Sequence, residues 1–184
     1  IKNKYNLLIN VEGFNVSFYS NSDNKSNLYN ILATVATINL YMNIKNLKKD
    51  IFLDLKIPDG RGDISKVKIK NKKVYLVDET YNSNPLSLKV AIENYDKINS
   101  KKFKKYLILG DMLELGKHSL KQHKLISKII NKTKIDQVYV TGRHIKETFK
   151  GLKPNKKAKI LDRKFDIIDL INNKLNNNDY LMIK

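Results

Sequence analysis

The stretch VYLVDETYNSNP, Val74 to Pro85, joins an apolar strand to the start of a helix through a polar loop. Val74–Val77 has the apolar character of a buried strand. Asn84 is a favoured helix N-cap, and Pro85 suits the first helical position. The loop between them carries two acids, a hydroxyl, a phenol and an amide. Because open α/β sheets bind ligands outside the carboxyl ends of their strands, this loop is the first candidate for a functional site.

Strand and helix patterns alternate around and beyond this loop. Strands are expected at 66–69, 74–77, 106–109, 138–141, 159–161 and 180–183. Helices are expected at 85–98, from a Ser119/Gln122 capping box onward to 130, at 146–150 and at 166–175. The alternation predicts an α/β fold with a mainly parallel, Rossmann-like sheet covered on both faces. The sequence lacks Gly-x-Gly-x-x-Gly, so it offers no case for NAD.

The first 56 residues have a different pattern. Apolar residues alternate between Tyr5 and Phe18 around a Glu12-Gly13 turn, which predicts a β-hairpin. Apolar residues at helical spacing over 28–42 predict a helix, and those over 47–55 a shorter one. The glycine-rich loop 59–63 is expected to be a hinge between two domains, residues 1–56 and 57–184.

Composition excludes several classes of protein. The chain has 184 residues, of which 41% are hydrophobic, enough for one full domain and part of another. It has no cysteine, which excludes disulfides, thiol nucleophiles and thiolate metal sites. No apolar run approaches the roughly 20 residues that cross a bilayer. The start lacks Met and a signal-peptide pattern, so we expect a cut edge there.

The net charge of +18 has two interpretations. Clustered Lys and Arg can neutralise nucleic-acid phosphates, whereas a lysine-rich surface can simply be solvated. The charge here is spread along the chain, with only three arginines, so nucleic acid is not the expected partner. A basic module that holds nucleotide or nucleic acid without catalysis remains the alternative function.

Two motifs resemble the MurF-type Mur ligases. Residues 78–85, DETYNSNP, resemble the family's Asp-Asp-Ser-Tyr-Asn-Ala-Asn-Pro, and residues 110–116, GDMLELG, match Gly-Asp-Met-x-Glu-Leu-Gly. The resemblance implies an ATP-dependent ligase of the bacterial cytoplasm that joins D-alanyl-D-alanine to UDP-N-acetylmuramoyl-tripeptide through an acyl phosphate in peptidoglycan synthesis. It also implies that 1–56 is the remnant of the central ATP-binding domain and that 57–184 is the C-terminal domain, truncated at its end.

The resemblance implies ATP and Mg²⁺ as cofactors, but parts of their site are missing. The sequence contains no Gly-x-x-x-x-Gly-Lys-Ser/Thr loop to wrap a triphosphate. In the family, that loop and the magnesium ligands lie upstream of the region that this chain resembles. We therefore expect the chain alone to be inactive. A decayed or truncated gene product without activity is a further possibility.

The resemblance assigns adenine contacts to Asn27 and Asn30. These residues fall in the first turn of the expected helix 28–42, where family asparagines contact ATP. Asn24 and Ser26 stand where the family has Gly and His. The alternative is that Asn27 only caps the helix, because Asn is a common N-cap.

The remaining nucleotide contacts are assigned to Arg61, Asp78 and Glu79. Arg61 corresponds to the arginine of a family Pro-x-x-Gly-Arg loop that helps hold the nucleotide; the alternative is an exposed linker residue. Asp78 and Glu79 are candidates for the ribose hydroxyls, because a carboxylate accepts two hydrogen bonds. Glu79 replaces an Asp of the family.

Substrate contacts are assigned to Asn82, Asn84 and Asp111. The two asparagines resemble family amides that line the cleft, and Asp111 is a candidate for the amine of the incoming dipeptide. The alternative for Asp111 is a turn-capping role after Gly110. No metal ligand is expected in this chain. A histidine base is not required by acyl phosphate chemistry, so we expect the histidines at 118 and 123 to be structural or exposed.

Overall fold

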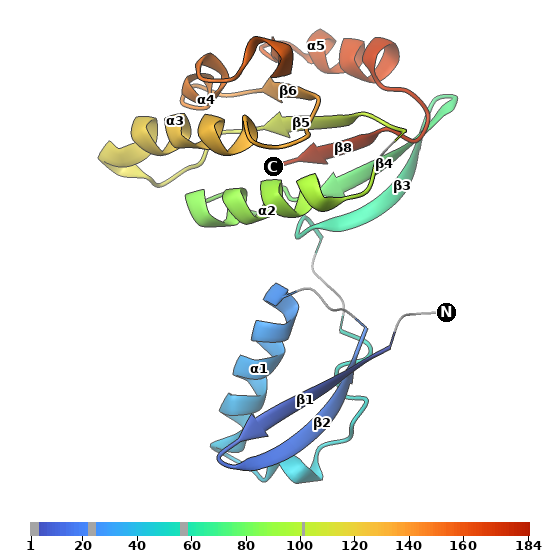
Figure 1. Cartoon of the computed structure of the whole chain (residues 1–184), viewed down its shortest axis with the longest axis vertical. Coiled ribbons are helices and arrows are strands. Elements are labelled where there is room, and N and C mark those ends of the chain that lie inside the picture. The colour runs from blue at the N-terminus through green and yellow to red at the C-terminus, as the bar shows by residue number, and fades with distance from the viewer. Residues whose placement is uncertain (1–3, 22–24, 56–58, 101) are drawn as a thin grey trace. The chain divides into compact units, whose positions relative to one another are not determined.

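The computed structural model describes residues 4–21, 25–55, 59–100 and 102–184 (Figure 1). The chain divides into two compact units, Ile1–Ile57 and Pro58–Lys184. Each unit has its own sheet and its own hydrophobic core, so each is described by itself.

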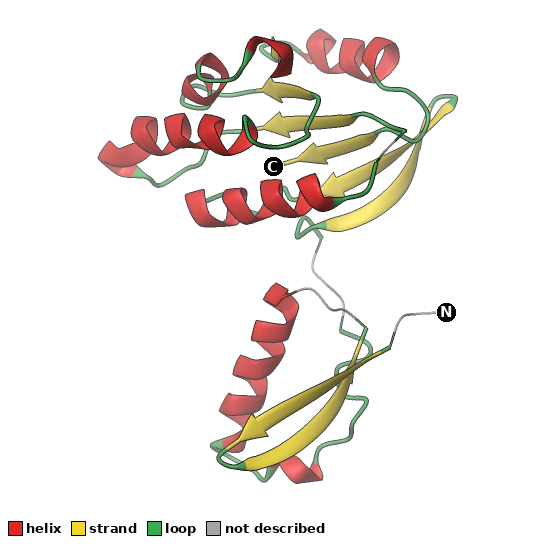
Figure 2. Ribbon diagram, viewed as in Figure 1, coloured by secondary structure: helices red, strands yellow, loops and turns green. Residues whose placement is uncertain are grey.

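The first unit is a hairpin packed on a helix (Figure 2). Strands β1 (Tyr5–Val11) and β2 (Phe14–Ser20) pair antiparallel across a turn at Glu12-Gly13, where both residues have positive φ, 48° and 87°. Helix α1 (Lys25–Asn39) buries Ile31 and Val35 against them. The predicted hairpin and long helix are confirmed. Because the helix begins at Lys25, Asn27 lies within its first turn and is not the N-cap residue.

The shorter helix predicted for 47–55 is wrong. A single 3₁₀ turn, η1 (Ile44–Asn46), is followed by turns and bends. The Tyr19 N–H donates to the Lys49 carbonyl at 2.6 Å, and Ser20 and Phe52 form a parallel bridge. The Phe52 ring packs edge-on against Phe18, with centroids 5.3 Å apart. The backbone here pairs with the edge of β2, and that pairing prevents the helical bonding that the apolar spacing suggested.

The second unit is built on a six-stranded sheet in the order β3-β4-β8-β5-β6-β7 (Figure 1). The antiparallel pair consists of β3 (Asp63–Ile69) and β4 (Lys72–Asp78). The parallel strands are β8 (Tyr180–Ile183), β5 (Lys105–Leu109), β6 (Gln137–Val140) and β7 (Lys157–Ile160). The mainly parallel sheet predicted from the alternation is confirmed, and the last strand inserts between β4 and β5.

Helices cover both faces of this sheet. One face carries α2 (Pro85–Lys97), α3 (Ser119–Ile130) and α4 (Lys146–Lys150). The other carries α5 (Lys164–Asp169), which continues as a π-helical segment, η4 (Leu170–Lys174). Two 3₁₀ turns, η2 (Gly116–His118) and η3 (Pro154–Lys156), complete the unit.

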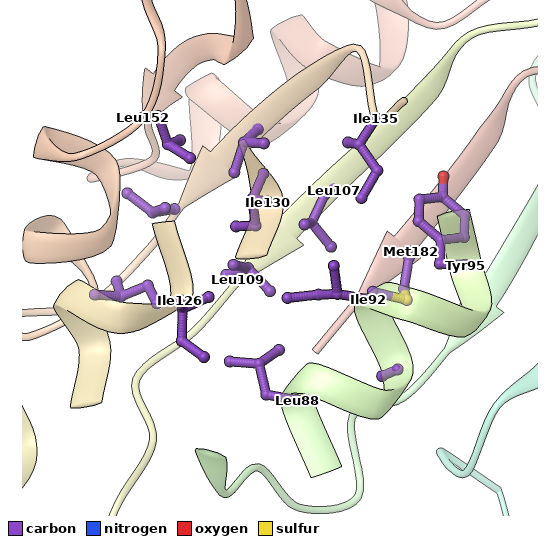
Figure 3. Packing of buried hydrophobic residues seen from close by; sticks show 14 of the residues in the cluster. Leu88, Ile92, Tyr95, Leu107, Leu109, Ile126, Ile130, Ile135, Leu152 and Met182 are labelled. Carbon is purple, nitrogen blue, oxygen red and sulfur yellow. The ribbon is translucent and has the colours of Figure 1, made fainter. Parts of the chain in front are cut away.

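The larger core lies between the sheet and helices α2 and α3 (Figure 3). Ile92 of α2 is fully buried and Ile126 of α3 is 2% exposed, and both pack against Leu107 and Leu109 of β5. The buried Tyr95 hydroxyl donates to the Tyr106 carbonyl at 2.9 Å, so its polar atom is satisfied. This packing holds the carboxyl ends of the central strands at one edge of the sheet.

The predicted capping box at Ser119 is wrong. The chain enters α3 from the 3₁₀ turn η2 already in helical conformation, and the His118 N–H bonds to the Leu115 carbonyl at 3.1 Å. Ser119 is therefore the first helical residue, and its hydroxyl lies 3.3 Å from His123 Nδ1. The last predicted helix starts at Lys164, two residues earlier than expected, because the Asp166 carboxylate accepts from the Arg163 N–H at 3.0 Å.

Candidate functional site

The carboxyl ends of β4, β8, β5 and β6 form one continuous edge. Asp78 pairs with Ile183, Leu109 pairs with Val140, and the Gly110 N–H donates to the Lys184 carbonyl at 2.8 Å. The residues that follow these strands therefore lie next to one another. The two motifs singled out in the sequence, 78–85 and 110–116, both begin at this carboxyl edge.

The segment 78–84, called here the edge loop, is ordered by its own side chains. Asp78 Oδ1 accepts from the Thr80 N–H at 3.0 Å and from the Thr80 hydroxyl at 2.7 Å. Asn84 Oδ1 accepts from the Ser87 N–H at 2.8 Å, and the Ser87 hydroxyl lies 3.1 Å from the Asn84 N–H. The predicted N-cap at Asn84 is confirmed, and its amide oxygen is used by α2. Within the described residues, Asp78 Oδ2 and the Asn82 amide nitrogen have no hydrogen-bond partner.

Arg61 lies against the edge loop. Its guanidinium carbon is 4.2 Å from the centroid of the Tyr81 ring, which is 64% exposed. The Gly62 N–H donates to the Asp78 carbonyl at 2.7 Å, and the Tyr81 N–H donates to the Gly60 carbonyl at 3.1 Å. The structure thus brings Arg61 and Asp78 together, as the resemblance requires if both serve one nucleotide.

The same bonds correct the hinge expected at 59–63. Gly60 and Gly62 are hydrogen-bonded into the second unit, with φ of 77° and 93°. A Cβ at Gly60 would lie 2.8 Å from the Tyr81 nitrogen, and one at Gly62 would lie 2.8 Å from Glu79 Oε1. These glycines are required for close packing and positive φ, so they are fixed parts of the second unit and not a free pivot.

Lys184 is a site residue that sequence reasoning missed. Its side chain is 3% exposed, and its Nζ lies 3.2 Å from Glu79 Oε2 and 3.0 Å from the Asn82 carbonyl. The Glu79 N–H also donates to the Ile183 carbonyl at 3.0 Å. A lysine that ends an apolar run carries no recognisable signal, because the insertion of β8 between β4 and β5 is not evident from sequence.

Asp111 connects two loops at the carboxyl edge. Its Oδ2 accepts from the Arg143 N–H at 2.8 Å, and its Oδ1 accepts from the Ile145 N–H at 2.7 Å. Gly142 has φ of 129°, and a Cβ there would lie 2.7 Å from the carboxylate. Asp111 therefore organises the loop after β6, whereas the turn-capping alternative placed its bonds in the turn after Gly110.

His123 is a neutral, structural histidine. It is fully buried, and its Nε2 accepts from the Met112 N–H at 3.0 Å. Its Nδ1 lies 2.8 Å from the Ser119 carbonyl, so Nδ1 carries the proton. The 3.9 Å approach to Asp111 is thus not an ion pair. His118 is exposed.

Two other polar atoms near this edge have no partner. Ser83 Oγ and His144 Nδ1 are buried without a hydrogen bond within the part of the chain that the structure describes. Ser83 belongs to the edge loop, and His144 belongs to the loop that Asp111 organises. Both can accept or donate a hydrogen bond to a ligand or to water.

The adenine candidates belong to the first unit. Asn27 is half-buried in the first turn of α1. Asn30 is exposed, and its carbonyl accepts from the Thr34 hydroxyl at 2.8 Å. The contacts of Asn30 are local to the helix, so its side chain remains available to a ligand.

Three groups with shifted pKa values, Lys105, Lys156 and Tyr106, lie away from the carboxyl edge. Lys105 begins β5 and donates to the Asp96 carbonyl at 2.7 Å, and burial lowers the pKa of its amine. Burial likewise lowers the pKa of Lys156, which donates to the Thr133 and Ile135 carbonyls. Burial raises the pKa of Tyr106 to about 12. These groups hold helix ends and strands together and show no link to catalysis.

No metal site is formed by the described residues: nowhere among them do three or more His, Cys, Asp or Glu side chains gather. In the same residues, no helix is both long and apolar enough to span a membrane. We therefore assign no step at this chain's residues to Mg²⁺.

Comparison with curated proteins finds the same family name repeatedly. A UDP-N-acetylmuramoyl-tripeptide–D-alanyl-D-alanine ligase from Buchnera aphidicola is 35% identical over 122 residues, which are 66% of this chain and 25% of that protein. The ligase of that name from Bacillus subtilis is 30% identical over 135 residues, 72% of this chain and 28% of that protein. The chain thus spans about a quarter of the length of these relatives.

Solved structures share the fold. A MurF ligase from Thermotoga maritima in complex with ADP has a TM-score of 0.70 at 22% identity, covering 98% of this chain and 40% of that one. A MurF from Acinetobacter baumannii has a TM-score of 0.71 at 18% identity, covering 98% and 39%. The family model described as the Mur ligase, glutamate ligase domain, matches residues 64–184, nearly the whole second unit. The chain therefore belongs to the Mur ligase family.

Proposed function

We propose that the whole protein containing this chain joins D-alanyl-D-alanine to UDP-N-acetylmuramoyl-tripeptide at the expense of ATP. The main support for this proposal is that residues 78–85 and 110–116, which are distant in sequence, meet at one carboxyl edge. The curated relatives of this chain are named as ligases of this reaction. We also propose that this reaction takes place in the bacterial cytoplasm.

In the proposed reaction, the free carboxylate of the tripeptide attacks the γ-phosphate of ATP, which forms an acyl phosphate and releases ADP. The dipeptide amine then attacks the acyl carbon, loses a proton, and expels inorganic phosphate as the amide forms. Positioning and charge stabilisation supply most of the acceleration in such chemistry. The ATP supplies the phosphoryl group, and Mg²⁺ would be bound by residues outside this chain.

On the nucleotide side, we assign Asp78 and Arg61 as the principal contacts from the second unit. Asp78 Oδ2 is free to accept from a ribose hydroxyl, because its Oδ1 is the atom bonded to Thr80. The Arg61 guanidinium is exposed above Tyr81 and can meet a phosphate or ribose oxygen. Asn27 and Asn30 of the first unit are assigned to adenine, and Glu79 remains a candidate whose carboxylate is engaged by Lys184.

On the substrate side, we assign Asn82, Asn84 and Asp111. The exposed Asn82 side chain can offer its amide nitrogen to a ligand, since only its oxygen is engaged, by the Ser83 N–H at 2.7 Å. The side-chain oxygen of Asn84 caps α2 by accepting from the Ser87 N–H, so only its amide nitrogen could contact the ligand. Asp111 can meet a cationic amine while still bonded to the loop after β6, because each carboxylate oxygen has a second lone pair.

The function is tested with the whole protein by measuring phosphate release from ATP. Release should require the UDP-linked tripeptide and D-alanyl-D-alanine together, and should stop when L-alanyl-L-alanine replaces the dipeptide. The 184-residue chain alone should release none. Binding of ATP or of nucleic acid by the whole protein without any ligation would favour the alternative, a basic binding module.

A further inference from the structure

The ammonium group of Lys184 is buried in the centre of the carboxyl edge. It follows β8, the strand between β4 and β5, and its side chain is 3% exposed. Removing an ammonium group from water is costly unless it is paired and fully hydrogen-bonded. Its three acceptors are Glu79 Oε2 at 3.2 Å, the Glu79 carbonyl at 3.4 Å and the Asn82 carbonyl at 3.0 Å. All three belong to the edge loop.

This arrangement uses the full donor capacity of the lysine. An ammonium group has three N–H donors and no acceptor. Three acceptors within 3.4 Å therefore leave no donor for a phosphate or carboxylate of a ligand. Lys184 is suited to holding the protein's own loop and not to contacting a substrate.

Glu79 is the counterpart of Lys184 on the loop. Its carboxylate is 22% exposed and faces the ammonium, while its backbone N–H is fixed to the Ile183 carbonyl. The absence of a side chain at Gly62 leaves the carboxylate room, because a Cβ there would lie 2.8 Å from Oε1. An Asp at position 79 would be one methylene shorter and would draw the carboxylate away from Lys184. The pairing thus gives a physical reason for Glu at this position.

We propose that Lys184 is a positioning residue, which through Glu79 and Asn82 sets the conformation of the edge loop and so places Asp78 and the Asn82 amide for ligand binding. In this arrangement Glu79 serves the loop rather than a ribose hydroxyl. The identity of the ligand, ATP, rests on the proposed function; the dependence of the loop on Lys184 does not.

The first test measures the coupling between the two residues in this chain. Unfolding equilibrium constants are compared for wild type, Lys184→Met, Glu79→Gln and the double variant. The exposed pair formed by Lys89 and Glu93, 3.9 Å apart on α2, is the matched control. For Lys184 and Glu79, the effect of the double substitution on the unfolding equilibrium constant should differ at least tenfold from the product of the two single effects. For the surface pair, the difference should be about twofold. Equal coupling in the two cycles would overturn the proposal.

The second test reports on the loop itself. In Lys184→Met and in Glu79→Gln, the amide ¹H–¹⁵N resonances of Thr80, Tyr81 and Asn82 should shift, whereas those of α3 should not. Glu79→Gln keeps the lysine and alters the partly exposed member of the pair, so it gives a result even where Lys184→Met does not fold. Unchanged loop resonances in folded Glu79→Gln would contradict the positioning role.

The third test links the loop to the ligand in the whole protein. Lys184→Met should weaken ATP binding at least tenfold, and Lys184→Arg, which retains the charge and donors, should recover part of it. Lys89→Met should have no effect. Wild-type protein that binds no ATP would count against the proposed function. Wild-type binding that Lys184→Met leaves unchanged would overturn this inference alone.

Discussion

Replacing Asp111 with Asn should destabilise the second unit by removing a charge that two backbone N–H groups share. The carboxylate bonds to the Arg143 and Ile145 N–H groups at 2.8 and 2.7 Å, and its side chain is 16% exposed. The variant keeps one carbonyl oxygen, so one bond survives in neutral form. The amide nitrogen of the new Asn cannot accept a hydrogen bond from the other backbone N–H, so two donors then face each other.

The magnitude follows from these two bonds. A hydrogen bond to a charged group contributes about 1.5–3 kcal/mol, and a neutral one about 0.5–1.5 kcal/mol. Losing one charged bond outright and reducing the other to neutral strength gives about 2.5–4.5 kcal/mol, and partial exposure moves the expectation toward the lower figure. The free energy of unfolding of the second unit should therefore fall by about 2.5 kcal/mol.

Urea unfolding of the chain, followed by circular dichroism, measures this difference. The matched control is Asp162→Asn, which removes an exposed carboxylate, 62% accessible and 3.3 Å from Lys146. That variant should change the free energy of unfolding by less than about 0.5 kcal/mol. If Asp111→Asn unfolds at the same urea concentration as the control, the carboxylate does not organise the loop after β6, and that assignment fails.

Three further outcomes are expected. Gly60→Ala should destabilise the second unit more than Gly116→Ala does, in thermal melts, because both glycines have positive φ but only at Gly60 would a Cβ meet backbone, 2.8 Å from the Tyr81 nitrogen. Ile92→Ala should lower the free energy of unfolding by about 2–5 kcal/mol in urea titrations, since Ile92 is fully buried between α2 and the sheet; a loss below about 1 kcal/mol would show that the core relaxes around the deletion. Stability should fall as pH rises from about 10 toward 12, because the unfolded Tyr106 releases its proton near 10.0 while the folded one holds it to a pKa of about 12. Tyr106→Phe should make that fall shallower in melts recorded across the same range without removing it, because burial also raises the pKa values of Tyr95 and Tyr139. An equally steep fall in Tyr106→Phe would exclude this residue as a source.

Much of the fold could be predicted because its elements carry local signals. Asn84-Pro85 predicts the start of α2, and the five-residue helix at 146–150 was predicted with its observed bounds. The strand order could not be predicted, because the insertion of β8 depends on its pairing with β5, about 75 positions away, and with β4, about 105 positions away. The helix expected at 47–55 failed because Phe52 packs against Phe18 of β2 while the backbone of this segment pairs with the strand.

Some residues of the candidate site could also be predicted from the sequence, and others could not. Asp78 and Asp111 could be found because strand ends followed by acids are visible in sequence, and the structure brings both to one edge. Lys184 could not, because its importance arises from burial against a loop about 100 residues away. Nor could the sequence show that both carboxylate oxygens of Asp111 are engaged by the backbone of 143 and 145.

The most direct test of the proposed ligase follows oxygen from substrate to phosphate. The whole protein is incubated with ATP, D-alanyl-D-alanine and UDP-N-acetylmuramoyl-tripeptide labelled with ¹⁸O in its free carboxylate, and the products are analysed by mass spectrometry. Ligation through an acyl phosphate predicts the condensed UDP-linked pentapeptide together with inorganic phosphate carrying one ¹⁸O atom per amide formed. Condensed product with unlabelled phosphate would contradict the acyl phosphate, and the absence of condensed product from folded, ATP-binding protein would contradict the ligase itself.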